Sequence, residues 1–199
     1  MSALDPRLLR EALGDCLVGR EISVLEETTS TNDSVLERAH CGAPEGLVVF
    51  AEHQTAGRGQ RANRWESAAH KGLWFSILLR PKIDIGESPR LSTWAIQSVA
   101  ETIQRELSLD AAVKPPNDVY IAGKKVAGVL VEMRAQRNAP HLAIIGIGIN
   151  VSHRPEDFSE EFQARAASLA MFLDRQLDGT SLAIALLRNL DRAYAHSFP

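Results

Sequence analysis

Cysteine is scarce in this sequence: among 199 residues there are two, Cys16 and Cys41. Two cysteines cannot build a disulfide framework, which favours a reducing compartment. The six histidines are scattered and form no His/Cys cluster at the spacing of metal ligands. The first helix-like segment is amphipathic and carries charges, which excludes a signal peptide or a membrane span there. The sequence therefore favours a cytoplasmic protein without a membrane partner.

A large excess of charge of one sign is also missing. Lys and Arg number 22 and Asp and Glu number 25, which leaves a formal charge of −3. This excludes a generally basic nucleic-acid-binding protein, although a local basic patch remains compatible with it. A chain of this length buries roughly 70% of its unfolded surface, enough for one large core or two small ones. We expect a single domain over residues 1–199.

Hydrophobic spacing and turn residues predict the order of the elements. Asp5-Pro6 starts a helix, and the apolar spacing after it predicts that the helix continues to Gly19. Further helices are expected at 33–40, 88–107 and 181–198, and strands at 21–25, 47–51, 73–79, 119–121, 125–133 and 142–151. The segment between the last strand and the last helix is also expected to be helical. Short turns join many of the strands, which predicts an α+β fold with a mixed, largely antiparallel sheet.

The segment 53–65 shows no hydrophobic periodicity and lies between two strongly apolar strands. Loops of this length in compact domains are usually functional or disordered. The segment carries Arg58, Arg61 and Arg64 and no acid, and its glycines let backbone amides approach a ligand. These features predict a phosphate site, in which Trp65 stacks on a base or closes over an apolar ligand. A solvated basic loop with Trp65 in the core is an equally good interpretation.

A second polar cluster lies at 114–118, where two adjacent prolines fix the backbone before Asn117 and Asp118. A rigid amide and carboxylate at a strand end can hold magnesium, a ribose or an incoming amine. A plain Asx turn is the commoner reason for this pair. Lys124 and Lys125 follow as neighbours on a strand, so their side chains point to opposite faces and only one can enter a site.

Gly146, Gly148 and Asn150 share one face of a predicted strand, and Ile147 and Ile149 share the other. Two glycines on one face indicate that a ligand or another part of the protein approaches closely. A bulge or close helix packing explains them equally well. The third glycine of a dinucleotide-binding fingerprint is missing.

Hydroxyl and amide side chains follow one another at 28–32, directly before a predicted helix. Such residues usually cap the helix. A cluster of neutral hydrogen-bonding groups also suits a small, polar, uncharged ring.

Together, these segments resemble the biotin protein ligase family in their order and spacing. The matching motifs, which span about residues 20–155, are Ser30-Thr31-Asn32, the run Gln54-Thr-Ala-Gly-Arg-Gly59 ending in Trp65, Asn117-Asp118, Lys125-Val-Ala-Gly128, Val131-Glu132 and Gly146-Ile-Gly-Ile-Asn150. The resemblance implies the family's catalytic domain, a mixed sheet with helices that is related in fold to lipoate ligases. It also implies two steps. The biotin carboxylate attacks the α-phosphorus of ATP to give biotinyl-5′-AMP and pyrophosphate, and a lysine of a biotin carboxyl carrier protein, as in acetyl-CoA carboxylase, then attacks the anhydride and releases AMP.

The resemblance further implies roles for individual residues. Lys125 lies between the biotin carboxylate and the α-phosphate, Arg58 supplies charge, and Asp118 orients or deprotonates the acceptor lysine or holds Mg²⁺. The implied biotin contacts are Ser30, Thr31, Asn32, Gln54, Gly57, Arg58, Gly59, Gln60, Lys125, Gly128 and Gly148. The implied nucleotide contacts are Arg58, Arg61, Trp65, Asn117, Lys125 and Asn150. ATP and Mg²⁺ are the implied co-substrates and biotin the substrate, and the loop is expected to close over the adenylate.

The sequence departs from the family pattern at several positions. Gln60 stands where the family commonly has arginine, Ala62 and Asn63 where it often has glycine and arginine, and Pro115 where tryptophan is usual. We expect the catalytic domain alone, without the DNA-binding helix-turn-helix of repressor members and without the small C-terminal β-barrel domain. A role as a DNA-binding repressor is therefore not expected, and the protein is expected to be a monomer or a homodimer.

Three other functions compete with this interpretation. A lipoate-type ligase would share the fold, but that family's Arg-Arg-x-Ser-Gly-Gly-Gly loop is absent from the sequence. A protein that binds biotin or biotinyl-AMP without transferring it is favoured by Gln60 and opposed by Lys125 and Asp118. A nucleic-acid-binding module has only the basic loop in its favour and is opposed by the net charge of −3.

Overall fold

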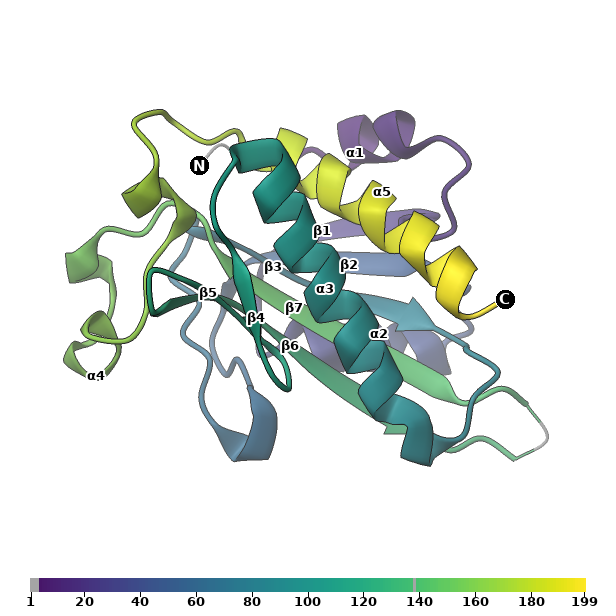
Figure 1. Ribbon diagram of the computed structural model, residues 1–199. Helices are drawn as coiled ribbons and strands as arrows, with labels where there is room; N and C mark the ends of the chain where they lie inside the picture. The colour runs from purple at the N-terminus through teal and green to yellow at the C-terminus, as the bar shows by residue number, and fades with distance from the viewer. Residues whose placement is uncertain (1–3, 138) are drawn as a thin grey trace.

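A seven-stranded sheet organises the molecule (Figure 1). The computed structural model describes residues 4–137 and 139–199, and only the backbone of Ala62. The strands are β1 (Glu21–Thr28), β2 (Leu47–Gln54), β3 (Gly72–Leu79), β4 (Ala112–Lys114), β5 (Asp118–Ile121), β6 (Lys124–Arg134) and β7 (Leu142–Asn150), in the spatial order β1-β2-β3-β7-β6-β5-β4. β1 and β2 are parallel and the other neighbouring pairs are antiparallel. The predicted α+β fold with a mixed, largely antiparallel sheet is confirmed.

Helices cover the two faces of the sheet unequally. α1 (Pro6–Leu13), α3 (Ser88–Leu107) and α5 (Gly179–Ser197) share one large hydrophobic core with one face, and α3 and α5 cross in front of the strands in Figure 1. On the other face α2 (Thr31–His40) packs mainly on β2, β3 and β7. The smaller core there consists of Val35, Leu47, Val49, Leu78, Leu142 and Ile144. Helix α2 thus covers only one end of its face.

The residue alternation in β7 explains how the two faces differ. Ile145, Ile147 and Ile149 are at most 3% exposed and belong to the large core. Gly146 and Gly148 alternate with them and therefore face the opposite side. The predicted division of this strand into an apolar face and a glycine face is confirmed. A strand face without side chains leaves space directly above the backbone.

The structure corrects two expected helix boundaries. α1 ends at Leu13, where Gly14 takes a positive φ of 59°, so the predicted continuation to Gly19 is wrong. Glycine is the residue that most readily adopts such a φ. α2 begins at Thr31, and Ser30 occupies its N-cap position without a hydrogen bond from its side chain to the helix. The hydroxyl of Ser30 therefore remains available for other contacts.

The segment 152–178 is mostly irregular, which corrects the expectation that it is helical. It contains the one-turn helix α4 (Glu160–Gln163) and 3-10 turns at Pro155–Asp157 and Leu169–Phe172. A further 3-10 turn at Ile85–Glu87 leads into α3. The remaining expected elements are present, with ends that shift by a few residues. None of the helices in the described part of the chain combines the length and the hydropathy needed to cross a bilayer.

A buried amide joins α3 to α5. Asn189 of α5 is 3% exposed, and its Nδ2 donates to the Ser98 carbonyl at 3.1 Å and to Thr102 Oγ1 at 3.2 Å. Both acceptors belong to α3, as does Glu101, whose Oε2 lies 3.5 Å from the same nitrogen. A buried polar group that loses its partners typically costs about 1–3 kcal/mol. These hydrogen bonds therefore fix how the two longest helices pack on each other.

We expect Asn189→Ala to lower the free energy of unfolding by about 1–3 kcal/mol, because the variant loses its hydrogen bonds to α3. Urea unfolding followed by circular dichroism measures this change. Thr93→Ala is the control, since Thr93 is exposed on α3 and its hydroxyl donates only to the Pro89 carbonyl of the same helix. The control should change stability by less than about 0.5 kcal/mol. Equal losses in the two variants would contradict the role assigned to Asn189.

Candidate functional site

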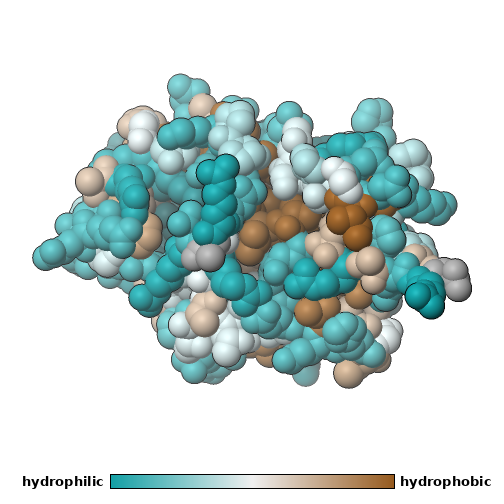
Figure 2. Space-filling model, turned by 90° about the horizontal axis from the view of Figure 1, so that it is seen from below, coloured by the Kyte–Doolittle hydropathy of each residue, from teal (hydrophilic) through white to brown (hydrophobic). Residues whose placement is uncertain are grey.

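A cavity of about 240 Å³ opens on the less covered face of the sheet, between the glycines of β6 and β7 and the loop that follows β2. Figure 2 looks onto the side from which this loop projects and shows a hydrophobic hollow in a largely hydrophilic surface. The cavity brings together most of the site residues predicted from the sequence. They are Ser30, Thr31, Asn32, Gln54, Arg58, Gly59, Gln60, Arg61, Trp65, Asn117, Asp118, Lys125, Gly128 and Gly148.

The loop of residues 55–65, here called the arginine loop, forms the roof of the cavity. It folds back as a hairpin, in which the Gly59 N–H donates to the Asn63 carbonyl at 2.7 Å and the Trp65 N–H to the Gly57 carbonyl at 2.9 Å. A Cβ at Gly57 would lie 2.6 Å from the Trp65 carbonyl, so the backbone can approach this closely only at a glycine. Gly57 thus shapes the loop and is not among the residues found to line the cavity.

The indole of Trp65 packs directly on the glycines of the sheet. A Cβ at Gly148 would lie 2.6 Å from the Trp65 ring, and one at Gly128 would lie 3.1 Å from it. Trp74 of β3 packs against the Trp65 ring at a centroid distance of 5.9 Å, with the ring planes 71° apart. The close approach predicted for this face is confirmed, and the approaching group is a side chain of the arginine loop.

Neutral hydrogen-bonding groups gather at the end of the cavity beside α2, here called the inner end. The N–H and Oγ1 of Thr31 donate to Gln54 Oε1 at 2.9 and 3.1 Å. Ser76, fully buried in β3, lies within hydrogen-bond distance of Thr31 Oγ1 at 2.7 Å and of Asn32 Oδ1 at 2.5 Å. Asn32 Nδ2 donates to Glu132 Oε2 at 2.6 Å. These bonds orient the amide and hydroxyl groups of the inner end.

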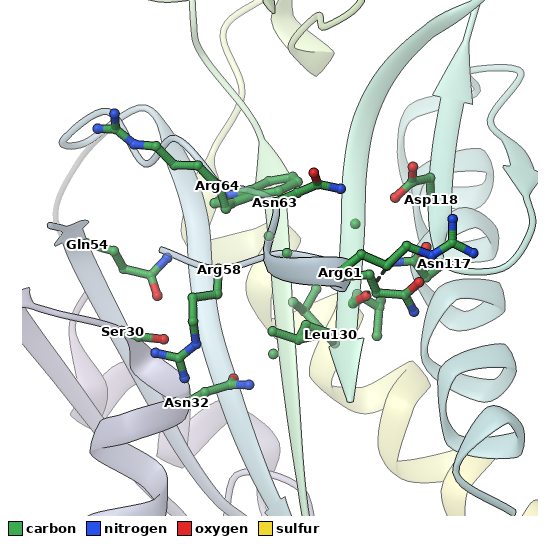
Figure 3. A pocket seen from close by; sticks show the side chains of 18 of the residues that line it. Ser30, Asn32, Gln54, Arg58, Arg61, Asn63, Arg64, Asn117, Asp118 and Leu130 are labelled. Carbon is green, nitrogen blue, oxygen red and sulfur yellow. Dashed lines mark hydrogen bonds between the residues drawn. The ribbon is translucent and has the colours of Figure 1, made fainter. Parts of the chain in front are cut away.

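Arg58 extends from the loop toward the inner end, beside Ser30 and Asn32 (Figure 3). Its two terminal nitrogens each donate to one Asp33 carboxylate oxygen at 2.7 Å, and one of them lies 3.4 Å from Glu132 Oε2. The hydrogen bonds from Arg58 hold the pKa of Asp33 below its usual value, and the same bonds raise the pKa of the guanidinium. The charge of Arg58, one of the three arginines from which the sequence suggested a phosphate site, is therefore already paired in the structure.

Lys125 stands at the opposite end of the cavity. Its Nζ is 2.6 Å from Asp118 Oδ1 and 5.2 Å from the centre of the Trp65 ring. The neighbouring Lys124 does not line the cavity, and its Nζ lies 3.5 Å from the Gln163 carbonyl at the exposed surface. The prediction that only one of these two neighbouring lysines enters the site is therefore confirmed.

Two asparagines expected at a nucleotide form hydrogen bonds with the backbone. Asn117, at the edge of the cavity and 9% exposed, donates from Nδ2 to the Val129 carbonyl at 2.7 Å. Asn150 lies outside the cavity and donates to the Ala167 carbonyl at 3.0 Å. The Ala167 N–H in turn donates to the Lys125 carbonyl at 2.9 Å. Asn150 therefore helps to hold the segment that pairs with the backbone of Lys125.

A second hollow, of about 490 Å³, adjoins the cavity beyond Lys125. The two spaces share Asn63, Arg64, Trp65, Asp118 and Lys125. The other walls of the second hollow are formed by Glu66, Tyr120, Asn150, Phe158, Glu161, Phe162, Arg165 and Ala166. In Figure 3, Arg64 extends away from the cavity, whereas Arg61 reaches toward Asn117. Lys125 and Asp118 thus stand between two adjacent hollows.

A family model described as the biotin/lipoate A/B protein ligase family matches residues 24–150, well over half of the chain. The chain belongs to this family. The matched range runs from β1 to the end of β7 and contains the arginine loop, Asp118 and Lys125.

Individual relatives agree with this membership. The bifunctional ligase/repressor BirA of Bacillus subtilis is 34% identical over 186 residues, which cover 94% of this chain and 57% of that protein. The biotin–[acetyl-CoA-carboxylase] ligase of Mycobacterium tuberculosis is 33% identical over 94% of this chain and 71% of its own length. A biotin protein ligase from Aquifex aeolicus, solved with biotin and ATP, matches with a TM-score of 0.76 at 30% identity, covering 88% of this chain and 71% of that one. The chain spans a little over half the length of the BirA proteins.

Several contributors to the site of this family member were not found from the sequence. Asp33 sits in the first turn of α2 and Ser76 in the middle of an apolar strand, so neither position carries a local signal. Glu132 appeared in a matching motif but without a role. Phe158 and Phe162 belong to the irregular segment whose conformation the sequence did not reveal.

We expect Gly148→Ala to lift the arginine loop from the sheet, because the added Cβ would lie 2.6 Å from the Trp65 ring. Limited trypsin digestion measures this, since the loop contains Arg58, Arg61 and Arg64, and cleavage should be faster in the variant. Gly86→Ala is the control, because a Cβ at Gly86 meets nothing within 4 Å. Cleavage at the wild-type rate in Gly148→Ala would mean that the loop does not depend on this contact.

His153 lies behind the second hollow, buried to 3% exposure. Its ring stacks on Phe158 at a centroid distance of 4.6 Å and meets Trp74 at 5.8 Å. Burial lowers the pKa of His153 to about 4, while Asp157 and Lys71 act in opposite directions. The neutral imidazole is therefore part of the folded structure.

Because of this histidine, the free energy of unfolding should fall as the pH is lowered. The unfolded chain binds a proton at His153 below about pH 6.5 and the folded chain only below about pH 4, so acidification through this window favours unfolding. Between pH 7 and pH 5 the wild type should lose about 1–2 kcal/mol more stability than His153→Phe, which cannot titrate. Urea unfolding of both proteins at the two pH values measures the difference. The same loss in both would contradict burial of a neutral His153.

Proposed function

We propose that this chain is the catalytic domain of an ATP-dependent biotin protein ligase. It activates biotin as biotinyl-5′-AMP and transfers the biotin to a lysine of a biotin carboxyl carrier protein. The observation that carries the proposal is one cavity with neutral hydrogen-bonding groups at one end and Lys125 at the other, joined to a second space beyond Lys125. The similarity to ligases whose structures contain biotin and ATP supports it.

The inner end suits the uncharged ureido ring of biotin. Thr31, Asn32 and Gln54 provide oriented hydroxyl and amide groups there, and the nearby charges of Arg58 and Asp33 neutralise each other. A neutral ring gains hydrogen bonds from such a site without leaving a buried charge unpaired. The carboxylate of biotin then extends along the glycine face toward Lys125.

The first step brings two anions together and therefore needs fixed positive charge. Lys125 is the cation at the junction of the two spaces, close to Asp118 and Trp65. A carboxylate oxygen of biotin attacks the α-phosphorus of ATP from the cavity side, and the bond from this phosphorus to pyrophosphate breaks. The ammonium group of Lys125 stabilises the negative charge that develops on the oxygens. The second hollow accommodates the nucleotide.

Asp118 is the carboxylate that fits a magnesium ion at this junction. Mg²⁺ in such sites is bound by one or two carboxylates together with phosphate oxygens, and it neutralises phosphate charge. No group of three or more His, Cys, Asp or Glu residues that could hold a metal by itself occurs within 4–137 and 139–199. A single carboxylate is thus consistent with an ion that arrives with ATP rather than one held by the protein alone.

The second step consumes the adenylate. The amine of the carrier lysine attacks the acyl carbon, the bond from that carbon to the phosphate oxygen breaks, and AMP leaves. The attacking amine must lose a proton, and Asp118 is the candidate to orient the acceptor lysine or to take up that proton. The arginine loop, which covers the cavity, excludes water from the anhydride.

One assay tests this proposal against its alternatives. Labelled ATP, biotin and a carrier domain are incubated with the protein, and both pyrophosphate release and biotin on the carrier are scored. A biotin protein ligase gives both products. Binding of biotin without pyrophosphate release indicates a non-catalytic binding protein, and activity with lipoate in place of biotin indicates a lipoate-type ligase, since the family model covers both kinds of enzyme.

Lys125→Ala should reduce the rate of biotinyl-AMP formation by about 100- to 1,000-fold and leave the fold intact, because the variant lacks the charge beside the reacting oxygens. Pyrophosphate exchange measures this rate. Lys124→Ala is the matched control: it removes the same charge from the exposed neighbour and should change the rate by less than about twofold. Equal losses in both variants would show that the effect does not depend on the position of Lys125.

A further inference from the structure

One side chain of the arginine loop contacts α2 at the inner end of the cavity. Both terminal nitrogens of Arg58 donate to the Asp33 carboxylate at 2.7 Å, in a geometry of two parallel hydrogen bonds. Pairs of this kind are the stronger form of charge-assisted hydrogen bond, and they fix orientation as well as distance. Because the two residues are 25 positions apart, the pair ties the loop to a helix instead of bridging one turn.

Glu132 of β6 connects this ion pair to the floor of the cavity. Its Oε2 lies 3.4 Å from Arg58 and accepts the hydrogen bond from Asn32, and its Oε1 lies 3.4 Å from Arg134. Two carboxylates and two guanidinium groups therefore neutralise each other beside the inner end. Both terminal nitrogens of Arg58 are engaged in this group.

We propose that Asp33 is a positioning residue that holds Arg58 and thereby keeps the arginine loop over bound biotinyl-AMP. The inference rests on the proposed function. Asp33 is not among the residues found to line the cavity, whereas Arg58 is, so Asp33 acts through Arg58. Arg58 accordingly connects the loop to α2.

Loss of the Asp33 carboxylate affects one part of the loop and spares another. In Asp33→Asn, Arg58 keeps the longer contact to Glu132 at 3.4 Å and at most one hydrogen bond to a neutral amide oxygen in place of two to a carboxylate. The packing of Trp65 on Gly148 is not touched by the change, so the other limb of the loop stays on the sheet. The loop should open more often, which speeds escape of the adenylate, while the chemistry at Lys125 continues.

The test is a double-mutant cycle on the release of preformed biotinyl-AMP. Release should be roughly five- to tenfold faster from Asp33→Asn than from the wild type. In the background of Arg58→Gln, the same change should have no further effect, because its partner is gone. In Asp33→Asn alone, the rate of adenylate formation in a single turnover should differ from the wild-type rate by less than about twofold. Glu37→Gln removes the same charge from an exposed position on α2 and should leave release unchanged.

Three results would overturn the inference. The first is release of biotinyl-AMP from Asp33→Asn at the wild-type rate. The second is an equal effect of Asp33→Asn on release in both backgrounds. The third is release from Asp33→Glu, which keeps a carboxylate, as fast as release from Asp33→Asn. An equal effect in both backgrounds is what a role confined to the stability of α2 predicts.

A second readout keeps this test separate from the proposed function. In the ligand-free protein, Asp33→Asn should accelerate trypsin cleavage after Arg61 and Arg64 about fivefold. In the background of Arg58→Gln, the same change should have no further effect on cleavage. A wild-type protein that forms no biotinyl-AMP disproves the proposed function, and the cleavage rates then decide the role of Asp33 by themselves.

Discussion

The contact of the Trp65 ring with bare strand backbone is the interaction on which this site depends. Gly148 and Gly128 lie on neighbouring strands beneath the ring, and a Cβ at either position would come within 3.1 Å of it. The opposite face of the same strands is filled by the large core, so the sheet cannot shift to make room. The position of the arginine loop, and with it the roof of the cavity, therefore follows from the absence of side chains at two positions.

An ion pair lies at each end of the cavity that this contact creates. At the inner end Arg58 is paired with Asp33 and Glu132, so hydrogen-bonding groups without unpaired charge remain for a ligand. At the other end Lys125 and Asp118 form a close pair at the border of the second hollow. In the proposed reaction, the neutral hydrogen-bonding groups receive the ring of biotin, and its carboxylate meets the nucleotide beside Lys125.

The position of Lys125 depends on a segment without regular structure. The Lys125 N–H donates to the Arg165 carbonyl at 2.8 Å, and its carbonyl accepts from the Ala167 N–H. Asn150 of β7 fixes Ala167 by a further hydrogen bond. The backbone of Lys125 thereby pairs with residues that follow β7 in sequence. Asn150, which lies outside the cavity, thus supports Lys125 through Ala167.

The sequence by itself determined the α+β class, most of the strands and long helices, and the motifs that meet in the cavity. Those features depend on short-range patterns: alternation in β7 separates isoleucines from glycines, and adjacent positions send Lys124 and Lys125 to opposite faces. Only the tertiary structure decided which side chains contact one another in the site. The ion pair of Arg58 with Asp33, the hydrogen bonds of Ser76, and the wall made by Phe158 and Phe162 join segments far apart in the chain. No local pattern encodes such contacts, because they depend on how sheet, helix and loop pack together.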